Sequence, residues 1–193
     1  IGGCFNEMGW DALNALSAED REAVLQAIFG KDGACFDYCR LPMGANDFAM
    51  SFYSSADVAG DFNLVNFNID RDRYILIPYI KAARQINPDL RIWASPWCPP
   101  PWMKTNNHYA SAVRPSGEKD VNGLLPHEAI AEFSTGFRME EGYLKTYADY
   151  FARFIKAYEA EGLPLECIHV QNEPCSNQVF PSCKWRTEDL TFF

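Results

Sequence analysis

The chain has 193 residues, of which 48% are hydrophobic, and its formal net charge at pH 7 is −9. This length and composition are those of an ordinary globular chain that can bury one core. The acidic balance argues against nucleic acid and anionic membrane surfaces as partners, because both require a basic surface. No apolar run approaches the roughly 20 residues that a membrane-spanning helix needs, so no membrane span is expected.

Short apolar runs alternate with amphipathic segments from the start of the chain. Residues 2–6 are typical of the end of a strand. Residues 17–29 predict a helix, because apolar side chains recur at helical spacing behind a serine cap. Residues 35–41 predict a second strand, which Pro42 is expected to end. The stretch 44–67, rich in Asn, Asp and Ser, indicates a long irregular loop.

The middle of the chain repeats this alternation. A helix is expected to begin at Asp70 and to kink or restart near Pro78, which lacks the backbone N–H that a helix interior needs. Residues 90–94 predict a third strand. The proline-dense residues 95–102 predict a rigid loop, because proline cannot pair inside a sheet. Residues 105–139 indicate a long polar excursion.

The last part of the chain contains the clearest helix, at residues 141–161, where apolar side chains share one face. Residues 166–170 predict a fourth strand, and residues 187–190 begin a further helix. Four strands that alternate with helices indicate βαβ units and a parallel α/β sheet. A doubly wound open sheet is the alternative to a barrel, but the Gly pair at 2–3 does not match its Gly-rich phosphate turn.

Seven cysteines are present. None has the paired spacing of a zinc site, and His108, His127 and His169 show no metal-ligand spacing, so we expect neither a metal nor another cofactor. Five cysteines in apolar contexts predict buried free thiols: Cys4, Cys35, Cys39, Cys98 and Cys167. Cys175 and Cys183 flank a polar loop, and a disulfide between them is one alternative if the protein is exported.

Glu173 is the strongest candidate for chemistry, in residues 171–174 (Gln-Asn-Glu-Pro) directly after the fourth predicted strand. In barrels of parallel strands, functional side chains gather at the C-terminal strand ends. Cleavage of a glycosidic bond requires a carboxylic acid that protonates the leaving oxygen, and a partly buried Glu suits that task. Asn172 can bond a sugar hydroxyl. The alternative is that Glu173 is a solvated turn residue.

Four segments resemble those of glycoside hydrolase family 30, which includes glucosylceramidases and endo-β-1,6-glucanases. They occur in the family's order along the whole chain, at residues 2–7 (GGCFNE), 40–48 (RLPMGANDF), 94–106 (ASPWCPPPWMKTN) and 171–174 (QNEP). The resemblance implies a (β/α)8 TIM barrel. Residues 1–193 would be the N-terminal half of that single catalytic domain, with about four βα units, truncated after the fourth strand.

The resemblance also assigns roles to individual residues. Glu173 would be the general acid/base, and Asn172 its substrate-binding neighbour. Asp47 and Trp97 would contact the sugar in the −1 pocket, and Arg40 would hold nearby carboxylates in place.

Trp102 and Tyr109 are further candidates, for outer sugar subsites. Each assigned role has a structural alternative, namely a turn cap, a core aromatic side chain or a loop ion pair. Glu7 is closer to a buried structural acid than to a catalytic one.

The family's second carboxylate, the nucleophile, resembles nothing in these residues and belongs at the end of the seventh strand. A complete barrel needs ~250 residues, and four units leave an open sheet edge and an uncovered interior. We therefore expect the nucleophile to lie beyond the chain end and the remaining half of the barrel to be a partner. The 193-residue chain alone is expected to be inactive.

The resemblance implies a retaining glycoside hydrolase that cleaves β-glucosidic linkages in a β-glucan or β-glucoside, most like an endo-β-1,6-glucanase. Glucosylceramidase, β-glucosidase and xylanase of the same family are alternatives, as is a non-catalytic carbohydrate-binding half-barrel. A secreted, periplasmic or cell-surface location is implied by the family alone.

Overall fold

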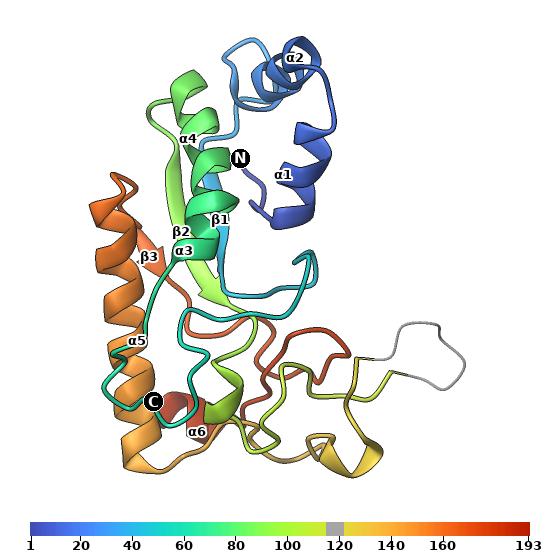
Figure 1. Cartoon of the computed structure of the whole chain (residues 1–193), viewed down its shortest axis with the longest axis vertical. Coiled ribbons are helices and arrows are strands. Elements are labelled where there is room, and N and C mark those ends of the chain that lie inside the picture. Colours follow the sequence, from blue (N-terminus) through green and yellow to red (C-terminus); the bar gives the residue numbers. More distant parts are fainter. Residues whose placement is uncertain (115–121) are drawn as a thin grey trace.

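A parallel sheet forms the centre of the computed structural model, which describes residues 1–114 and 122–193 (Figure 1). Its strands are β1 (Tyr38–Met43), β2 (Arg91–Pro96) and β3 (Cys167–Ile168), in that order. The first predicted strand is reduced to a single parallel bridge beside β1, between Cys4 and Arg40. The four predicted strand segments are therefore spatial neighbours in chain order, as successive βα units require.

β1 differs from the predicted second strand at both ends. It begins later than expected, at Tyr38, and it passes through Pro42. The Arg40 N–H donates to the Gly3 carbonyl at 2.8 Å, and residues two apart in a strand direct their backbone groups to the same side. The nitrogen of Pro42, which carries no hydrogen, therefore faces the segment of Gly3 and not β2. The pairing of β1 with β2 is intact.

β2 confirms the predicted third strand and extends it. The expectation that the loop begins at Ser95 is wrong, because Ser95 and Pro96 pair with the last two residues of β1. The loop that follows contains a short 3-10 turn, η1 (Pro101–Met103). A second such turn, η2 (Pro126–Glu128), lies in the predicted polar excursion, of which residues 115–121 are outside the described part of the chain.

Two helices precede β1 in the chain. The sequence pattern did not predict α1 (Glu7–Asn14), whose short length and internal glycine weaken the helical signal. The Asn6 side chain caps α1 by accepting a backbone N–H of its first turn at 2.7 Å. α2 (Ala18–Phe29) confirms the helix expected at 17–29, with Ser17 accepting an N–H at 3.1 Å.

The helix expected to begin at Asp70 is divided in two, as the position of Pro78 led us to predict. α3 (Asp70–Tyr74) and α4 (Leu76–Ile86) are separated at Ile75, which has non-helical dihedral angles. Pro78 has no N–H to offer the carbonyl four residues earlier, so the helix cannot continue through this point. Tyr74 was expected on the apolar side and is instead 82% exposed.

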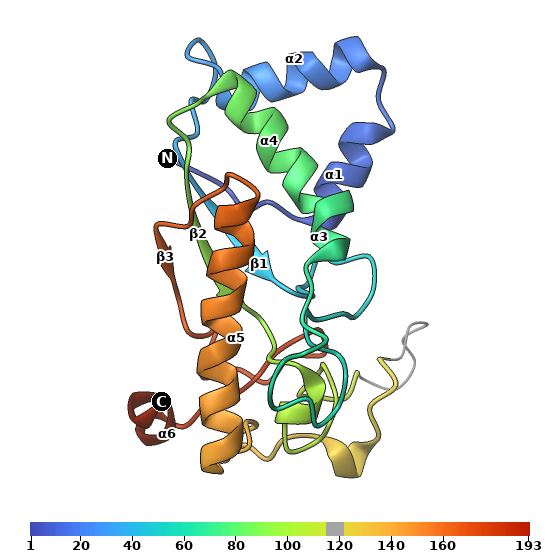
Figure 2. The same cartoon turned by 60° about the vertical axis from the view of Figure 1, so that its left-hand side comes forward.

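Helices α4 and α5 (Glu141–Ala160) lie along the sheet in both views (Figures 1 and 2). α5 confirms the clearest predicted helix. One face of the sheet is buried, through Cys39, Leu41, Met43, Ile92 and Ala94. Alternate residues point the other way, and there Tyr38, Arg40 and Trp93 are only half-buried. The helices thus cover one face, and the opposite face is open.

Aromatic side chains fill the space between α5 and the C-terminal segment. Four residues of α5 are completely buried, namely Tyr147, Tyr150, Phe154 and Tyr158. Trp185 stacks on Phe137 at 4.8 Å and on Phe193 at 5.8 Å between ring centroids. This packing fixes the last helix, α6 (Thr187–Phe192), which the sequence predicted, against the polar excursion.

The seven cysteines are all free. Cys39 and Cys98 are buried as expected, but the expectation of burial is wrong for three others, namely Cys4, Cys35 and Cys167. Cys4 and Cys167 lie on the open face of the sheet, where no helix covers them. The alternative of a disulfide is not realised, because Cys183 is buried in the core and Cys175 is exposed.

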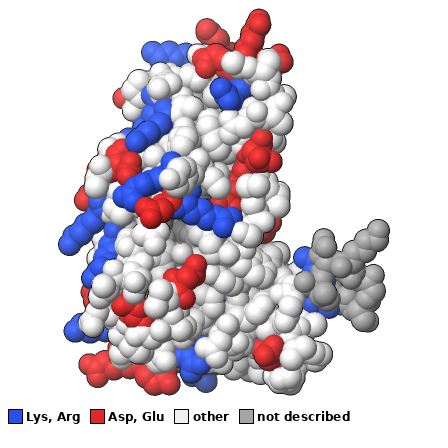
Figure 3. All heavy atoms as spheres, in the orientation of Figure 1, with Lys and Arg blue, Asp and Glu red and all other residues white. Residues whose placement is uncertain are grey.

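On the face drawn in Figure 3, basic side chains are interspersed with acidic ones. Ion pairs join the helices: Glu161, at the end of α5, contacts Arg73 at 2.7 Å and Lys81 at 3.4 Å. Within residues 1–114 and 122–193, no helix is long and apolar enough to cross a membrane.

Candidate active site

Arg40, Ser95 and Asn172 meet at the C-terminal end of the sheet. The Arg40 guanidinium donates to Ser95 Oγ through Nε and Nη2, at 2.9 and 2.6 Å, and its Nη2 also donates to Asn172 Oδ1 at 2.6 Å. These residues come from β1, from β2 and from the end of the segment after β3, which are neighbours in the sheet. Because the Asn172 amide oxygen is engaged, its N–H groups are what this side chain can offer to a bound molecule.

Arg40 also contacts a predicted sugar-binding residue. The centre of its guanidinium lies 3.8 Å from the ring centroid of Trp97, a cation–π contact. Burial lowers the pKa of Arg40, and the carboxylates of Asp47 and Glu173 act in the opposite direction. Both carboxylates are therefore within electrostatic reach of Arg40. Its direct hydrogen bonds, however, go to Ser95 and Asn172 rather than to a carboxylate.

Glu173 lies immediately after Asn172 and has two properties that the sequence did not predict. It is exposed rather than partly buried, and its φ is +46°, in the left-handed region. The following Pro174 disfavours helical conformations at this position, and left-handed backbone at a non-glycine residue costs about 1–2 kcal/mol. The turn after β3 therefore holds Glu173 in a conformation that the chain would not adopt by local preference.

Gln171 anchors this turn from the buried side. Its Nε2 donates to the Trp97 carbonyl at 2.8 Å, and its Oε1 accepts the Trp185 indole N–H at 3.3 Å. Gln171 is 8% exposed, so both ends of its amide are satisfied inside the protein. The sequence placed Gln171 in the motif without a role. No sequence signal identified it or Ser95 as the supports of Asn172.

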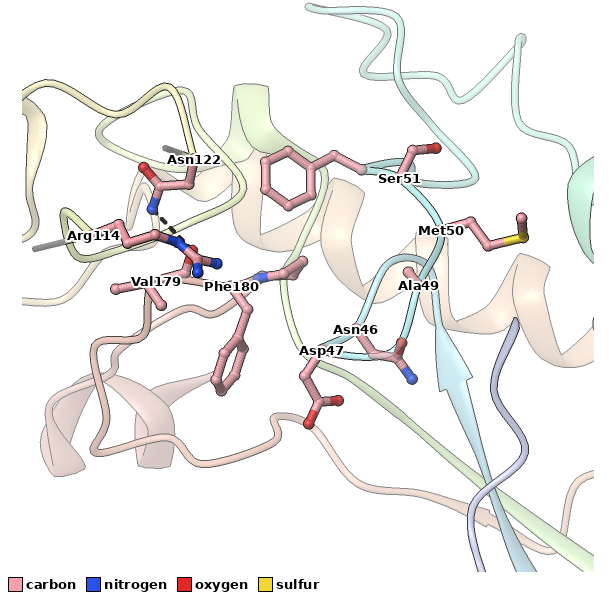
Figure 4. A pocket seen from close by; sticks show the side chains of 11 residues that line it. Asn46, Asp47, Ala49, Met50, Ser51, Arg114, Asn122, Val179 and Phe180 are labelled. Carbon is pink, nitrogen blue, oxygen red and sulfur yellow. Dashed lines mark hydrogen bonds between the residues drawn. The ribbon is translucent and has the colours of Figure 1, made fainter. Parts of the chain in front are cut away.

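Asp47 borders a hollow of about 420 Å³ (Figure 4). Asp47 is exposed and follows β1, whereas Phe180 belongs to the segment after Glu173. Asn122 closes another side and donates to the Val179 carbonyl at 2.8 Å. The hollow therefore lies between the loop after β1 and the loop after Glu173, where a bound molecule can contact both.

Trp102 and Tyr109 lie together at a second hollow, of about 390 Å³. Trp102 is 7% exposed, and its indole N–H donates to the Ala56 carbonyl at 2.8 Å. Tyr109 donates to Asp57 at 2.7 Å, and burial raises its pKa. The structure thus gives both side chains partners of their own, and a role in outer subsites stays a prediction.

Glu7, His108 and His169 take structural positions. Glu7 is 2% exposed and pairs with Arg71, whose Nε and Nη2 lie 2.6 and 2.8 Å from its oxygens. This confirms the interpretation of Glu7 as a buried structural acid. His108 accepts the Ala110 N–H at 3.0 Å, and His169 packs on Trp93. In the described ranges, no group of three His, Cys, Asp or Glu residues can hold a metal ion.

Comparisons with known proteins agree on one family. The family model described as "Glycosyl hydrolase family 30 TIM-barrel domain" matches residues 1–184. The chain is 32% identical over 97% of its length to putative glucosylceramidase 4 of Caenorhabditis elegans, covering 32% of that protein. It is 29% identical over 86% of its length to endo-1,6-beta-D-glucanase of Neurospora crassa, covering 31% of it.

A solved structure shows the same fold. The chain superposes on an endo-β1,6-glucanase with a TM-score of 0.75 and 26% sequence identity, covering 97% of this chain and 38% of the other. The chain therefore spans about a third of the length of the relatives that it matches.

Proposed function

Because this chain belongs to glycosyl hydrolase family 30 and forms part of its TIM-barrel fold, we propose that it contributes the general acid/base to a retaining hydrolysis of β-glucosidic linkages. Glu173 would be that acid/base. The observation that carries the proposal is the 2.6 Å bond from Arg40 to Asn172 Oδ1, which orients the residue next to Glu173. A carboxyl group at a strand end, beside an amide that can bond a sugar 2-hydroxyl, supplies one of the two carboxyl groups that such a reaction needs.

In the proposed reaction, Glu173 protonates the glycosidic oxygen as the bond from that oxygen to the anomeric carbon breaks, and the anomeric carbon forms a bond to a nucleophilic carboxylate that water later hydrolyses. Asn172 donates an N–H to the sugar 2-hydroxyl, a bond that strengthens as positive charge develops on the ring. Asp47 and Trp97 would contact the same sugar, since both lie close to Arg40. Trp102, which borders a hollow with Tyr109, would serve an outer subsite.

We further propose that the nucleophilic carboxylate comes from outside residues 1–193, together with the remaining half of the barrel. The support is twofold: the chain spans about a third of its relatives' length, and one face of its sheet is open. The exposure of Glu173 fits this proposal, because the missing half would cover that side of the site. The chain by itself would then be inactive.

The proposed substrate is a β-glucan or β-glucoside, and the proposed activity is most like that of an endo-β-1,6-glucanase. Relatives named endo-1,6-beta-D-glucanase and putative glucosylceramidase match at 29% and 32% identity, so both activities belong to the proposal. A secreted, periplasmic or cell-surface location is proposed from the family.

Glu173→Gln in the natural-length protein that contains this chain tests the proposal. We expect loss of hydrolysis of β-1,6-glucan and of aryl β-glucosides, because Gln cannot donate the proton, while glucan binding is retained. Glu166→Gln is the matched control: this exposed carboxylate precedes β3 and pairs with Arg91 at 3.4 Å. Full activity of Glu173→Gln would remove Glu173 from the mechanism. Binding without hydrolysis in the unmodified protein would instead support a carbohydrate-binding half-barrel.

A further inference from the structure

Gln178 connects the turn that bears Glu173 to the polar excursion. Its backbone carbonyl accepts the N–H groups of Ser111 and Ala112, each at 3.0 Å, and its own N–H donates to Ser182 Oγ at 3.2 Å. An antiparallel bridge between Ala110 and Pro181 lies beside these bonds. The backbone of Gln178 is thus held by a segment more than 60 residues earlier in the chain.

A buried cation reinforces this connection. The Lys104 ammonium is completely buried and donates to the carbonyl oxygens of Ser182 and Tyr109, at 2.7 and 3.0 Å. It therefore joins the loop after Glu173 to the excursion from the inside. The side chain of Gln178 therefore projects from a backbone that these bonds hold in place.

The side-chain amide of Gln178 uses both of its N–H groups. Its Nε2 lies 2.6 Å from Ser176 Oγ and 3.2 Å from Glu173 Oε2. A glutamine amide has two N–H donors, so one can serve the hydroxyl and the other the carboxyl oxygen. Across residues 1–114 and 122–193, this is the one hydrogen bond that reaches the Glu173 carboxyl group.

Glu173 needs such a support because its own surroundings supply little. It is exposed, and its backbone lies in the left-handed region, outside regular structure. An exposed glutamate side chain samples several rotamers, and restricting them to one costs about 1–2 kcal/mol of conformational entropy. A bond to a fixed amide compensates part of that cost and selects one carboxyl orientation.

We propose that Gln178 is a positioning residue that binds Oε2 of Glu173 and leaves Oε1 as the oxygen that delivers the proton. The inference rests on the proposed function of Glu173. An amide N–H can donate to a carboxylate oxygen and, less strongly, to the carbonyl oxygen of the protonated acid, so Oε2 keeps its partner in both states. The proton on Oε1 passes to the glycosidic oxygen, which takes the electron pair of the breaking bond to the anomeric carbon. Oε1 later accepts a proton from the attacking water.

Leaving-group dependence separates this role from a merely structural one. A 2,4-dinitrophenolate departs without protonation, whereas a phenolate needs the acid. For Gln178→Met, which keeps the side-chain length and removes the donor, we expect kcat/KM for phenyl β-glucoside to fall about tenfold, one part of the 10²–10⁴ that general acids contribute. For the 2,4-dinitrophenyl substrate we expect a change of less than about twofold. The assay uses the natural-length protein that contains this chain.

The ratio of the two kcat/KM values, measured on one sample, does not depend on the fraction that is folded. Asn177→Ala is the matched control, because its side chain anchors the same loop to the Ile130 carbonyl at 2.8 Å without contacting Glu173. Its ratio should equal that of the parent. Equal losses on both substrates, or no loss, for Gln178→Met would overturn the inference.

Glu173→Gln in the same assay separates the role of Gln178 from the role of Glu173. If Glu173→Gln shows the leaving-group dependence and Gln178→Met does not, only the role of Gln178 fails. If Glu173→Gln shows none, the proposed acid/base role fails as well.

Discussion

The contribution of Asp72 to the unfolding free energy should increase as the pH is lowered. Asp72 lies in α3 and is 1% exposed, and its two carboxyl oxygens accept hydrogen bonds from Tyr53 and Tyr158 at 3.1 and 2.7 Å. Burial raises its pKa from 3.8 to about 6, because the low-dielectric interior disfavours the charge, although the two tyrosine hydrogen bonds act in the opposite direction.

The size and sign of the effect follow from this shift. A folded-state pKa above the unfolded value means that the folded protein binds the proton more tightly. The contribution of Asp72 is therefore fully favourable below pH 3.8 and is lost as the pH rises to about 6. A shift from 3.8 to about 6, at 1.36 kcal/mol per pKa unit, corresponds to about 3 kcal/mol of unfolding free energy.

Asp72→Asn isolates this contribution, because asparagine has a similar shape and cannot ionise. Urea unfolding of the parent and of the variant would be compared between about pH 4 and pH 7. We expect the stability of the variant relative to the parent to rise by about 2.4 kcal/mol over that interval, because part of the Asp72 contribution is already lost at pH 4. Carboxylates whose pKa is lowered by hydrogen bonds, such as Asp61 and Glu161, act in the opposite direction, but they are common to both proteins and cancel.

The control is Asp70→Asn, since Asp70 belongs to the same helix and its side chain is 65% exposed. Its stability difference from the parent should change much less with pH. A difference between Asp72→Asn and the parent that is constant from pH 4 to pH 7 would refute the reasoning, since it would mean that burial does not penalise the Asp72 charge.

Two further substitutions test buried charges. Glu7→Gln should reduce the unfolding free energy by about 2–3 kcal/mol. This is less than the loss expected on breaking a fully buried ion pair, because Arg71 is 31% exposed and can be solvated. Unchanged stability in urea unfolding would contradict the structural role of Glu7. Lys104→Met should cost about 3–5 kcal/mol, because it leaves buried acceptors, among them the Ser182 carbonyl, without their donor. A loss below about 1 kcal/mol in the same measurement would show that water replaces the ammonium.

The local signals in the sequence were reliable because the interactions behind them are local. The Ser17 cap and the apolar face of residues 141–161 depend on contacts within a few positions of the chain, and both appear as predicted. The break caused by Pro78 has the same origin, since it is the absence of one N–H. The order of strands and helices, and the place of the Gln-Asn-Glu-Pro motif at a strand end, followed from that pattern.

The sequence alone therefore determined the family, the succession of βα units and the identity of Glu173 as the candidate acid. Only the tertiary structure brought Arg40 to Asn172, across 132 positions of the chain. It also placed Gln178 against a Glu173 that is exposed and left-handed, where local preference favours extended backbone before proline. Such contacts arise when parallel strands and distant loops pack together, and no short-range pattern of residues encodes which side chains then meet.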